Sequence, residues 1–196
     1  MLTDELASWR NFYELLGTAS GTLVGLLFVA ASVSSGVFSS DRMGPLRIFL
    51  GASVVNFSGI LTVCLFLLAP IGRPILLGSL VAAGGLFGLG YYAITWRDTV
   101  RDGLIKRIDL EDRTWYAFLP VACYLLETAT GIALACDVAL GRPALAVIMT
   151  ALLLIGIHNA WDITVWSISR AAKRQGGQNV PQKPSPQPGQ TEADGD

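Results

Sequence analysis

The chain has 196 residues, of which 52% are hydrophobic and only 15% are charged, and its formal net charge is −1. Soluble domains carry about 25% charged residues, so this composition argues against a water-soluble globule and against a disordered chain. It also offers none of the excess positive charge that attracts nucleic acid. The composition therefore predicts an integral membrane protein whose first partner is the lipid bilayer and which binds no nucleic acid.

Five long segments with at most one charged residue each follow one another along the chain, and they are residues 15–40, 48–72, 74–96, 114–136 and 143–169. A helix that rises about 1.5 Å per residue crosses the hydrocarbon core with roughly 20 apolar residues, and each segment is long enough. Backbone amides in lipid must bond within their own segment, which favours helices, and the alternation typical of barrel strands is missing. We therefore predict an all-α fold, a polytopic bundle of five transmembrane helices within residues 1–174. The predicted spans are about 15–38, 47–70, 74–96, 115–139 and 143–168.

The basic residues outside these spans are distributed unevenly between the two sides of the bundle. Of the 14 Lys and Arg residues, only Arg10, Arg73 and Arg142 fall on the side of the N-terminus, and the other eleven fall opposite. Basic loops stay in the cytoplasm, so we expect the N-terminus outside and the C-terminus in the cytoplasm. The acidic start, residues 1–5, argues against a cleaved signal peptide. The expected location is the cell membrane, either an inner or a plasma membrane.

Two connections between spans are short, and two polar segments lie beyond the spans. The turns at 70–74 and 140–143 predict that the helices they join are antiparallel neighbours. Residues 97–114 form a predicted cytoplasmic loop of mixed charge, with apolar residues at every fourth position from Val100. This pattern suits either a short amphipathic helix or a solvated connector. Residues 175–196 are rich in Pro, Gln and Gly and form a predicted disordered cytoplasmic tail.

Small residues recur along one face of the first predicted span. Such a stripe lets another helix backbone approach closely, which is how helices associate in lipid, within one bundle or between copies in a homo-oligomer. The alternative is that the glycines and hydroxyl groups line a narrow pathway that contains water. The residues of this stripe are Gly17, Thr18, Gly21, Thr22, Gly25 and Ser32.

Two acids and the only histidine lie well inside the predicted spans. Charged side chains there cost several kcal/mol, so they face the bundle interior and find partners. The predicted hairpin of the last two helices places Glu127 within reach of His158, and Asp162 follows one turn later on the same face. Such a network either fixes the register of the helices or relays protons or ions. The candidate network consists of Glu127, His158, Asp162, Asn159 and Asn56.

Catalytic signatures are missing from the sequence. It contains no G-x-S-x-G elbow, no H-E-x-x-H pair and no P-loop, so we expect no enzyme activity, no catalytic residue and no cofactor. His158, Asp162 and Glu127, with Cys123, could in principle form a metal site. This is a weaker alternative to a polar network without metal, because the site would contain only one imidazole. The three cysteines lie within spans without the spacing of a disulfide framework.

Two functions of different class remain open from the sequence. The first is a small oligomeric permeation protein, channel-like or proton-linked, which uses the polar network or the small-residue stripe. One subunit of this size is small for a complete transport path, which favours a homo-oligomer. The second is a non-catalytic membrane scaffold or partner-binding subunit that contacts other membrane helices through its glycine faces.

Overall fold

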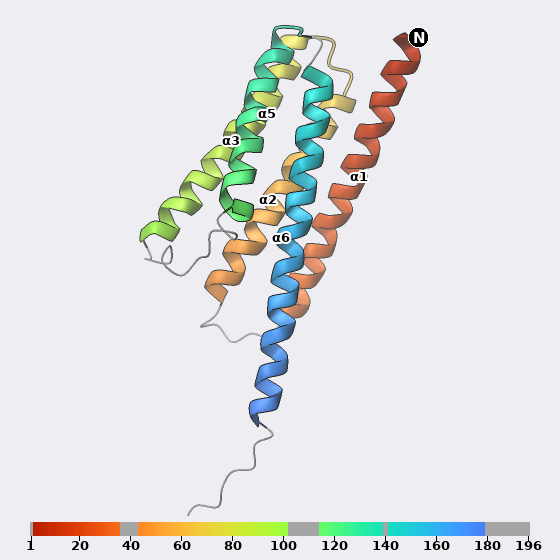
Figure 1. Cartoon of the computed structure of the whole chain (residues 1–196). Coiled ribbons are helices and arrows are strands. Elements are labelled where there is room, and N and C mark those ends of the chain that lie inside the picture. The colour runs from red at the N-terminus through yellow and green to blue at the C-terminus, as the bar shows by residue number, and fades with distance from the viewer. Residues whose placement is uncertain (1, 36–42, 102–113, 139–140, 179–196) are drawn as a thin grey trace, which may run out of the picture. The chain divides into compact units, whose positions relative to one another are not determined.

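The computed structural model describes residues 2–35, 43–101, 114–138 and 141–178, and these residues form helices and turns without a strand. The chain divides into two units, of which the first, Met1–Ile163, contains the helix packing analysed below and the second begins at Thr164 within the last helix. Figure 1 shows the elements α1 (Leu2–Ser35), α2 (Met43–Leu68), α3 (Pro74–Arg101), η3 (Thr114–Phe118), α5 (Leu119–Ala135) and α6 (Gly141–Gln178). The element η3 is a short π-helical turn that continues into α5.

Five segments of the described helices are long and apolar enough to cross a membrane. The predicted all-α fold with five helices able to cross a membrane is therefore confirmed for the described residues. Pro74 and Pro143 fall in the first turn of α3 and α6, where a missing N–H group breaks no intrahelical bond. The five segments are Trp9–Ser32, Gly51–Leu68, Pro74–Arg101, Thr114–Ala135 and Gly141–Asp162.

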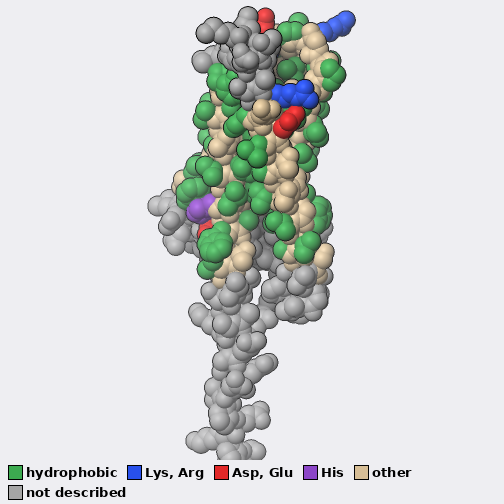
Figure 2. Space-filling view, turned by 90° about the vertical axis from the view of Figure 1, so that its right-hand side faces the viewer, with side chains coloured by type: hydrophobic (Ala, Val, Ile, Leu, Met, Phe, Trp, Pro, Cys, Tyr) green, Lys and Arg blue, Asp and Glu red, His purple; other side chains and the backbone are tan. Residues whose placement is uncertain are grey.

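The outer surface of the first unit is apolar. Large hydrophobic side chains are exposed on every one of its long helices, among them Leu15, Leu65, Phe87, Leu126 and Val147. Figure 2 shows hydrophobic side chains over much of the visible face, with Lys and Arg near one end. Water-soluble monomers rarely expose such extended apolar surface, whereas a lipid-facing surface requires it.

Four helices extend beyond the predicted spans. Helix α1 begins at Leu2, α2 begins at Met43, α3 continues to Arg101, and α6 continues to Gln178, past the predicted start of the tail at residue 175. The hydrocarbon thickness sets the apolar length of a span, whereas a helix continues through polar residues until its sequence or a turn ends it. The predicted loop from 102 to 113 and the tail from 179 lie outside the described residues.

Both predicted hairpins bring neighbouring helices into contact. Helix α5 ends in a Schellman motif, in which the N–H of Val138 bonds to the carbonyl of Ala133 and Asp137 adopts a left-handed φ of 58°. The chain then reverses, and Gly141 at the start of α6 lies against Leu134. Helices α2 and α3 likewise pack on each other across their short connection.

The closest helix packing in the first unit joins α3 to α5, which lie side by side in Figure 1. A Cβ atom added to Gly78 would overlap the backbone of Gly131, and one added to Gly131 would overlap the backbone of Ala82. Further along, Gly85 lies against the backbone of Tyr124. The two antiparallel helices therefore meet backbone to backbone, the arrangement that small residues permit in lipid.

The other helices pack through larger side chains. Helix α1 rests on α2, where a Cβ atom added to Gly17 would lie 3.1 Å from the Cβ of Cys64. The hydroxyl of Tyr13 donates a hydrogen bond of 2.9 Å to the carbonyl oxygen of Arg142, which joins α1 to α6. The ring of Phe57 on α2 fills the space beside Gly156 of α6, and both residues are buried. These contacts place α2 at the centre of the packing.

Replacing Gly85 by alanine tests the backbone contact of α3 with α5. Gly85→Ala should lower the free energy of unfolding by about 1–3 kcal/mol, because the methyl group would meet the amide nitrogen of Thr128 at 2.8 Å and the carbonyl oxygen of Tyr124 at 2.9 Å. Thermal unfolding of the purified protein in detergent measures the change. Gly90→Ala on the same helix is the matched control, since nothing lies within 4 Å of its added methyl. Equal unfolding temperatures for the two variants would contradict this packing.

Candidate functional site

Buried polar side chains from three helices meet inside the first unit. The hydroxyl groups of Tyr92 on α3 and Tyr124 on α5 both donate hydrogen bonds to Oδ1 of Asn56 on α2, at 3.1 and 3.0 Å. Asn56 is 0% exposed, and the two tyrosines are buried with it. One amide oxygen therefore fixes the register of three helices. We call Asn56, Tyr92 and Tyr124 the Asn56 cluster.

The sequence identified Asn56 but not its two partners. Tyr92 and Tyr124 resemble the aromatic residues of a membrane interface when only residue type is considered. Their depth was the available signal, because Tyr92 lies about one turn and Tyr124 more than two turns inside the end of its predicted span. A tyrosine at such depth needs a partner for its hydroxyl group.

Glu127 lies one turn after Tyr124 on α5 and is only 2% exposed. Its Oε1 atom lies 3.1 Å from the position that a Cβ atom on Gly84 would occupy, and Cγ2 of Val63 lies 3.9 Å from the same position. The carboxyl group thus reaches α3 at a glycine and lies close to α2. Among the described residues, no Lys, Arg or His forms an ion pair with it.

His158 and Asp162 lie on α6 beside η3, away from Glu127, and they are paired with each other. The histidine ring stacks on Trp115 of η3 with a centroid distance of 3.9 Å, and its Nδ1 atom is 3.3 Å from Oδ2 of Asp162. These two atoms are close enough for an ion pair but do not meet the geometry of a hydrogen bond. The side chain of His158 is 37% exposed and that of Asp162 is 42% exposed. The His158–Asp162 pair therefore lies at the surface of the bundle and not in its core.

The expected contact between Glu127 and His158 is not formed: within the described residues, no ion pair joins these two side chains. The register of the last hairpin explains the difference. His158 lies opposite Trp115, and twelve residues, or about 18 Å of helix, separate Trp115 from Glu127.

Several buried polar atoms have no hydrogen-bond partner among the described residues. The carbonyl oxygen of Asn159 accepts a hydrogen bond of 3.3 Å from the hydroxyl of Tyr116, but its side-chain amide has no partner. The same holds for the amide nitrogen of Asn56 and for the hydroxyls of Ser20 and Ser53. Buried polar groups of this kind are normally satisfied by water or a ligand.

The small-residue stripe of α1 divides into two surfaces. Gly17 and Gly21 face α2, whereas nothing lies within 4 Å of a Cβ atom added to Gly25. The three hydroxyl residues of the stripe are exposed, and each donates a hydrogen bond of 2.8 Å to a carbonyl group one turn earlier on its own helix; they are Thr18, Thr22 and Ser32. This arrangement favours a packing surface over a water-filled pathway, because the hydroxyl protons are already bonded.

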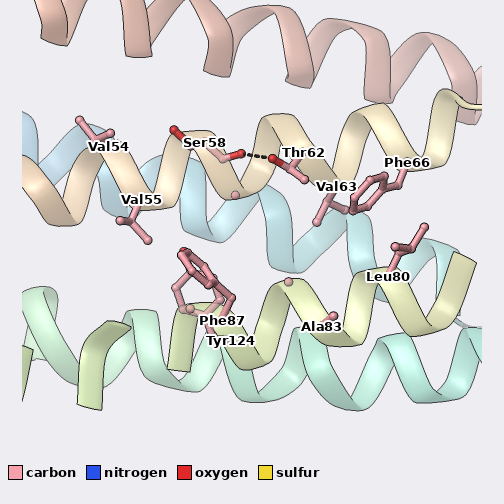
Figure 3. A pocket seen from close by; sticks show the side chains of 13 residues that line it. Val54, Val55, Ser58, Thr62, Val63, Phe66, Leu80, Ala83, Phe87 and Tyr124 are labelled. Carbon is pink, nitrogen blue, oxygen red and sulfur yellow. Dashed lines mark hydrogen bonds between the residues drawn. The ribbon is translucent and has the colours of Figure 1, made fainter. Parts of the chain in front are cut away.

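A groove of about 350 Å³ separates α2 from α3, and Tyr124 of α5 lies at its base. In Figure 3, Val55 and Val63 point from α2 toward α3, while Phe87 and Tyr124 lie on the opposite side of the space. Three glycines contribute to its walls, and they are Gly59, Gly84 and Gly88. Its polar residues besides Tyr124 are Ser58 and Thr62, and the Thr62 hydroxyl donates to the carbonyl of Ser58.

The described residues contain no group of three His, Cys, Asp or Glu side chains that could hold a metal ion. The three cysteines are free, with Cys64 and Cys123 buried and Cys136 exposed at the end of α5. Comparison of the chain with protein-family models, curated proteins and solved structures finds no match. Among the described residues, the candidate site combines the buried carboxyl group of Glu127, the Asn56 cluster and the apolar groove.

Removing the shared acceptor tests the Asn56 cluster. Asn56→Leu should lower the free energy of unfolding by about 1–3 kcal/mol, because two buried hydroxyl groups lose their acceptor. Adding Tyr92→Phe and Tyr124→Phe to this variant should restore part of the loss, since no orphaned hydroxyl then remains. Thermal unfolding in detergent is the measurement. Thr62→Val, at an exposed hydroxyl bonded to its own helix, is the control, and a similar loss there would contradict the proposed role.

Proposed function

We propose that this chain is a small membrane protein that carries an ion or a small substrate across the bilayer in a proton-linked process, with Glu127 as the proton-binding group. The observation that carries the proposal is the position of this carboxyl group, which is 2% exposed and has no basic partner among the described residues. An uncompensated charge at such a place costs several kcal/mol. The charge is compensated either by a proton or by a cation bound beside it, and the exchange of one for the other couples their movements.

The surroundings of Glu127 support this role. The Asn56 cluster lies one turn away and brings hydroxyl and amide groups into the core, where they can bond to water. Gly84, the residue against which the carboxyl group rests, is one of the residues that line the groove. The His158–Asp162 pair is more exposed and already paired, so we assign it no part in the exchange.

We infer that the protein resides in a cell membrane with its N-terminus outside and its C-terminus in the cytoplasm. Five apolar helices and the exposed hydrophobic side chains support residence in a bilayer. The uneven distribution of the 14 Lys and Arg residues supports the orientation.

The native Cys136 provides a direct test of the orientation, since it is exposed in the turn between α5 and α6. We expect a membrane-impermeant maleimide to label it on intact cells or right-side-out vesicles, and Cys136→Ser to abolish the labelling. A reporter placed by Arg97→Cys in the Cys136→Ser background should be labelled only after permeabilisation. Labelling of the residue-97 reporter on intact cells would reverse the proposed orientation.

We further propose that copies of the chain associate through α1. This helix is the least buried of the five candidate spans, and Thr18, Thr22 and Gly25 face outward from it. Small outward-facing residues allow close approach of a second helix. The same surface favours the second candidate function, that of a non-catalytic membrane scaffold, if the protein carries nothing across the bilayer.

Proton flux in proteoliposomes distinguishes the two functions. The vesicles contain a trapped pH dye and are loaded with K⁺ or an organic cation, and they are diluted into buffer without that cation. The reconstituted protein should then acidify the lumen faster than empty vesicles do, because each cation that leaves is exchanged for a proton. Glu127→Gln should reduce this flux about ten-fold or more, because the amide side chain does not exchange protons. His158→Ala is the matched control and should keep the flux within about two-fold, because this side chain is remote from the core cluster. Absence of flux from intact, assembled protein would contradict permeation and favour the scaffold.

A further inference from the structure

We propose that the groove between α2 and α3 binds lipophilic cations, organic ions with an apolar body and one positive charge, and that Glu127 compensates that charge. The inference rests on the proposed function, because it names the class of substrate that exchanges with the proton on Glu127. Three features of the described residues support this inference: the apolar walls of the groove, its aromatic rings and the closeness of Gly84 to the carboxyl group of Glu127.

The walls of the groove suit an apolar body. The space of about 350 Å³ falls in the range of small-molecule sites, which extends from roughly 300 to 1,000 Å³. Valine, leucine, phenylalanine and glycine supply most of its lining. Phe87 at its edge is 73% exposed, so the groove reaches the surface of the bundle, where lipid lies against the helices. A ligand that partitions into the bilayer can therefore enter from the side.

Aromatic rings favour a cation over a neutral body of the same size. Phe66, Phe87 and Tyr124 contribute to the groove from three different helices. The face of an aromatic ring attracts a positive charge by about 0.5–2 kcal/mol, with the larger value in a desolvated site. An anion would find no basic side chain among the residues that line the groove.

Glu127 does not itself line the groove, but its carboxyl group lies against Gly84, which does. Gly84 lines the groove, and Oε1 of Glu127 lies only 3.1 Å from the place where its Cβ would stand. A larger side chain at position 84 would lie between the groove and the carboxyl group of Glu127. A cation against Gly84 therefore lies close enough to Glu127 for a strong charge interaction in apolar surroundings. The step is an exchange in which the carboxylic acid releases its proton as the cation binds and takes one up as the cation leaves.

Among the described side chains, no other charge near the groove competes for this role. The ionisable neighbours of Glu127 on α5 are Cys123 and Tyr124, and Tyr92 of α3 lies beyond Tyr124. The described side chains of α2, from residue 51, include Cys64 but no charged residue, and the buried side chains of α1 include Tyr13 but no charged residue. The buried side chains of α6 before His158 are uncharged.

Equilibrium binding of tetraphenylphosphonium to the purified full-length protein in detergent tests the inference. We expect saturable binding by one cation per chain, with an affinity that falls as the pH is lowered, since protons compete for Glu127. Glu127→Gln should weaken binding about ten-fold or more and remove its pH dependence. Asp162→Asn removes the other acid of the spans and should leave the affinity within about two-fold. Neutral triphenylphosphine oxide should not displace the bound cation.

A second variant separates a lost site from a lost fold. Ala83 lines the groove and is exposed, so Ala83→Phe should narrow the space and weaken binding about ten-fold while leaving the unfolding temperature unchanged. Equal binding by Glu127→Gln, or displacement by the neutral compound, would overturn the inference and identify the groove as a surface for lipid tails. Cation binding that needs Glu127, without flux in proteoliposomes, would retain the site and refute transport. Proton flux that needs Glu127, without cation binding, would refute only the substrate class.

Discussion

The hydrogen bonds to the amide oxygen of Asn56 are the constraint on which the arrangement of the core depends. The side chains of Tyr92 and Tyr124 are buried, so their hydroxyl groups need an acceptor within the protein. They find it in the same atom, and α2, α3 and α5 are thereby held in one register. With that register set, Glu127 falls beside Gly84 and not beside a larger side chain.

The groove forms because α3 packs more closely against α5 than against α2. Gly78, Gly85 and Gly131 let α3 approach α5 until their backbones touch, whereas α3 meets α2 mainly through side chains. Because α3 lies close to α5, a space remains between α3 and α2, and that space is the groove. The same glycines that stabilise the pair α3–α5 therefore create an apolar space next to a buried acid.

The two acids of the candidate network differ because their surroundings differ. Asp162 is partly exposed and has His158 as a partner of opposite charge when the imidazole is protonated. Glu127 is 2% exposed and lies against Gly84 of α3. An acid paired at a surface contributes little beyond local stability, whereas burying an acid inside an apolar bundle is costly. The two acids therefore differ in burial and in pairing among the described residues.

The sequence by itself determined the helical class, the number of candidate spans and the polar residues worth examining, because apolar length and composition are properties of consecutive residues. Which helices touch, and at what register, depends on contacts between segments far apart in the chain. Only the tertiary structure therefore paired Asn56 with two tyrosines, separated Glu127 from His158 and divided the stripe of α1 into a packed and an outward face. A shift of one residue in register turns a helical side chain by about 100°, since a turn holds 3.6 residues, and no local pattern specifies that angle.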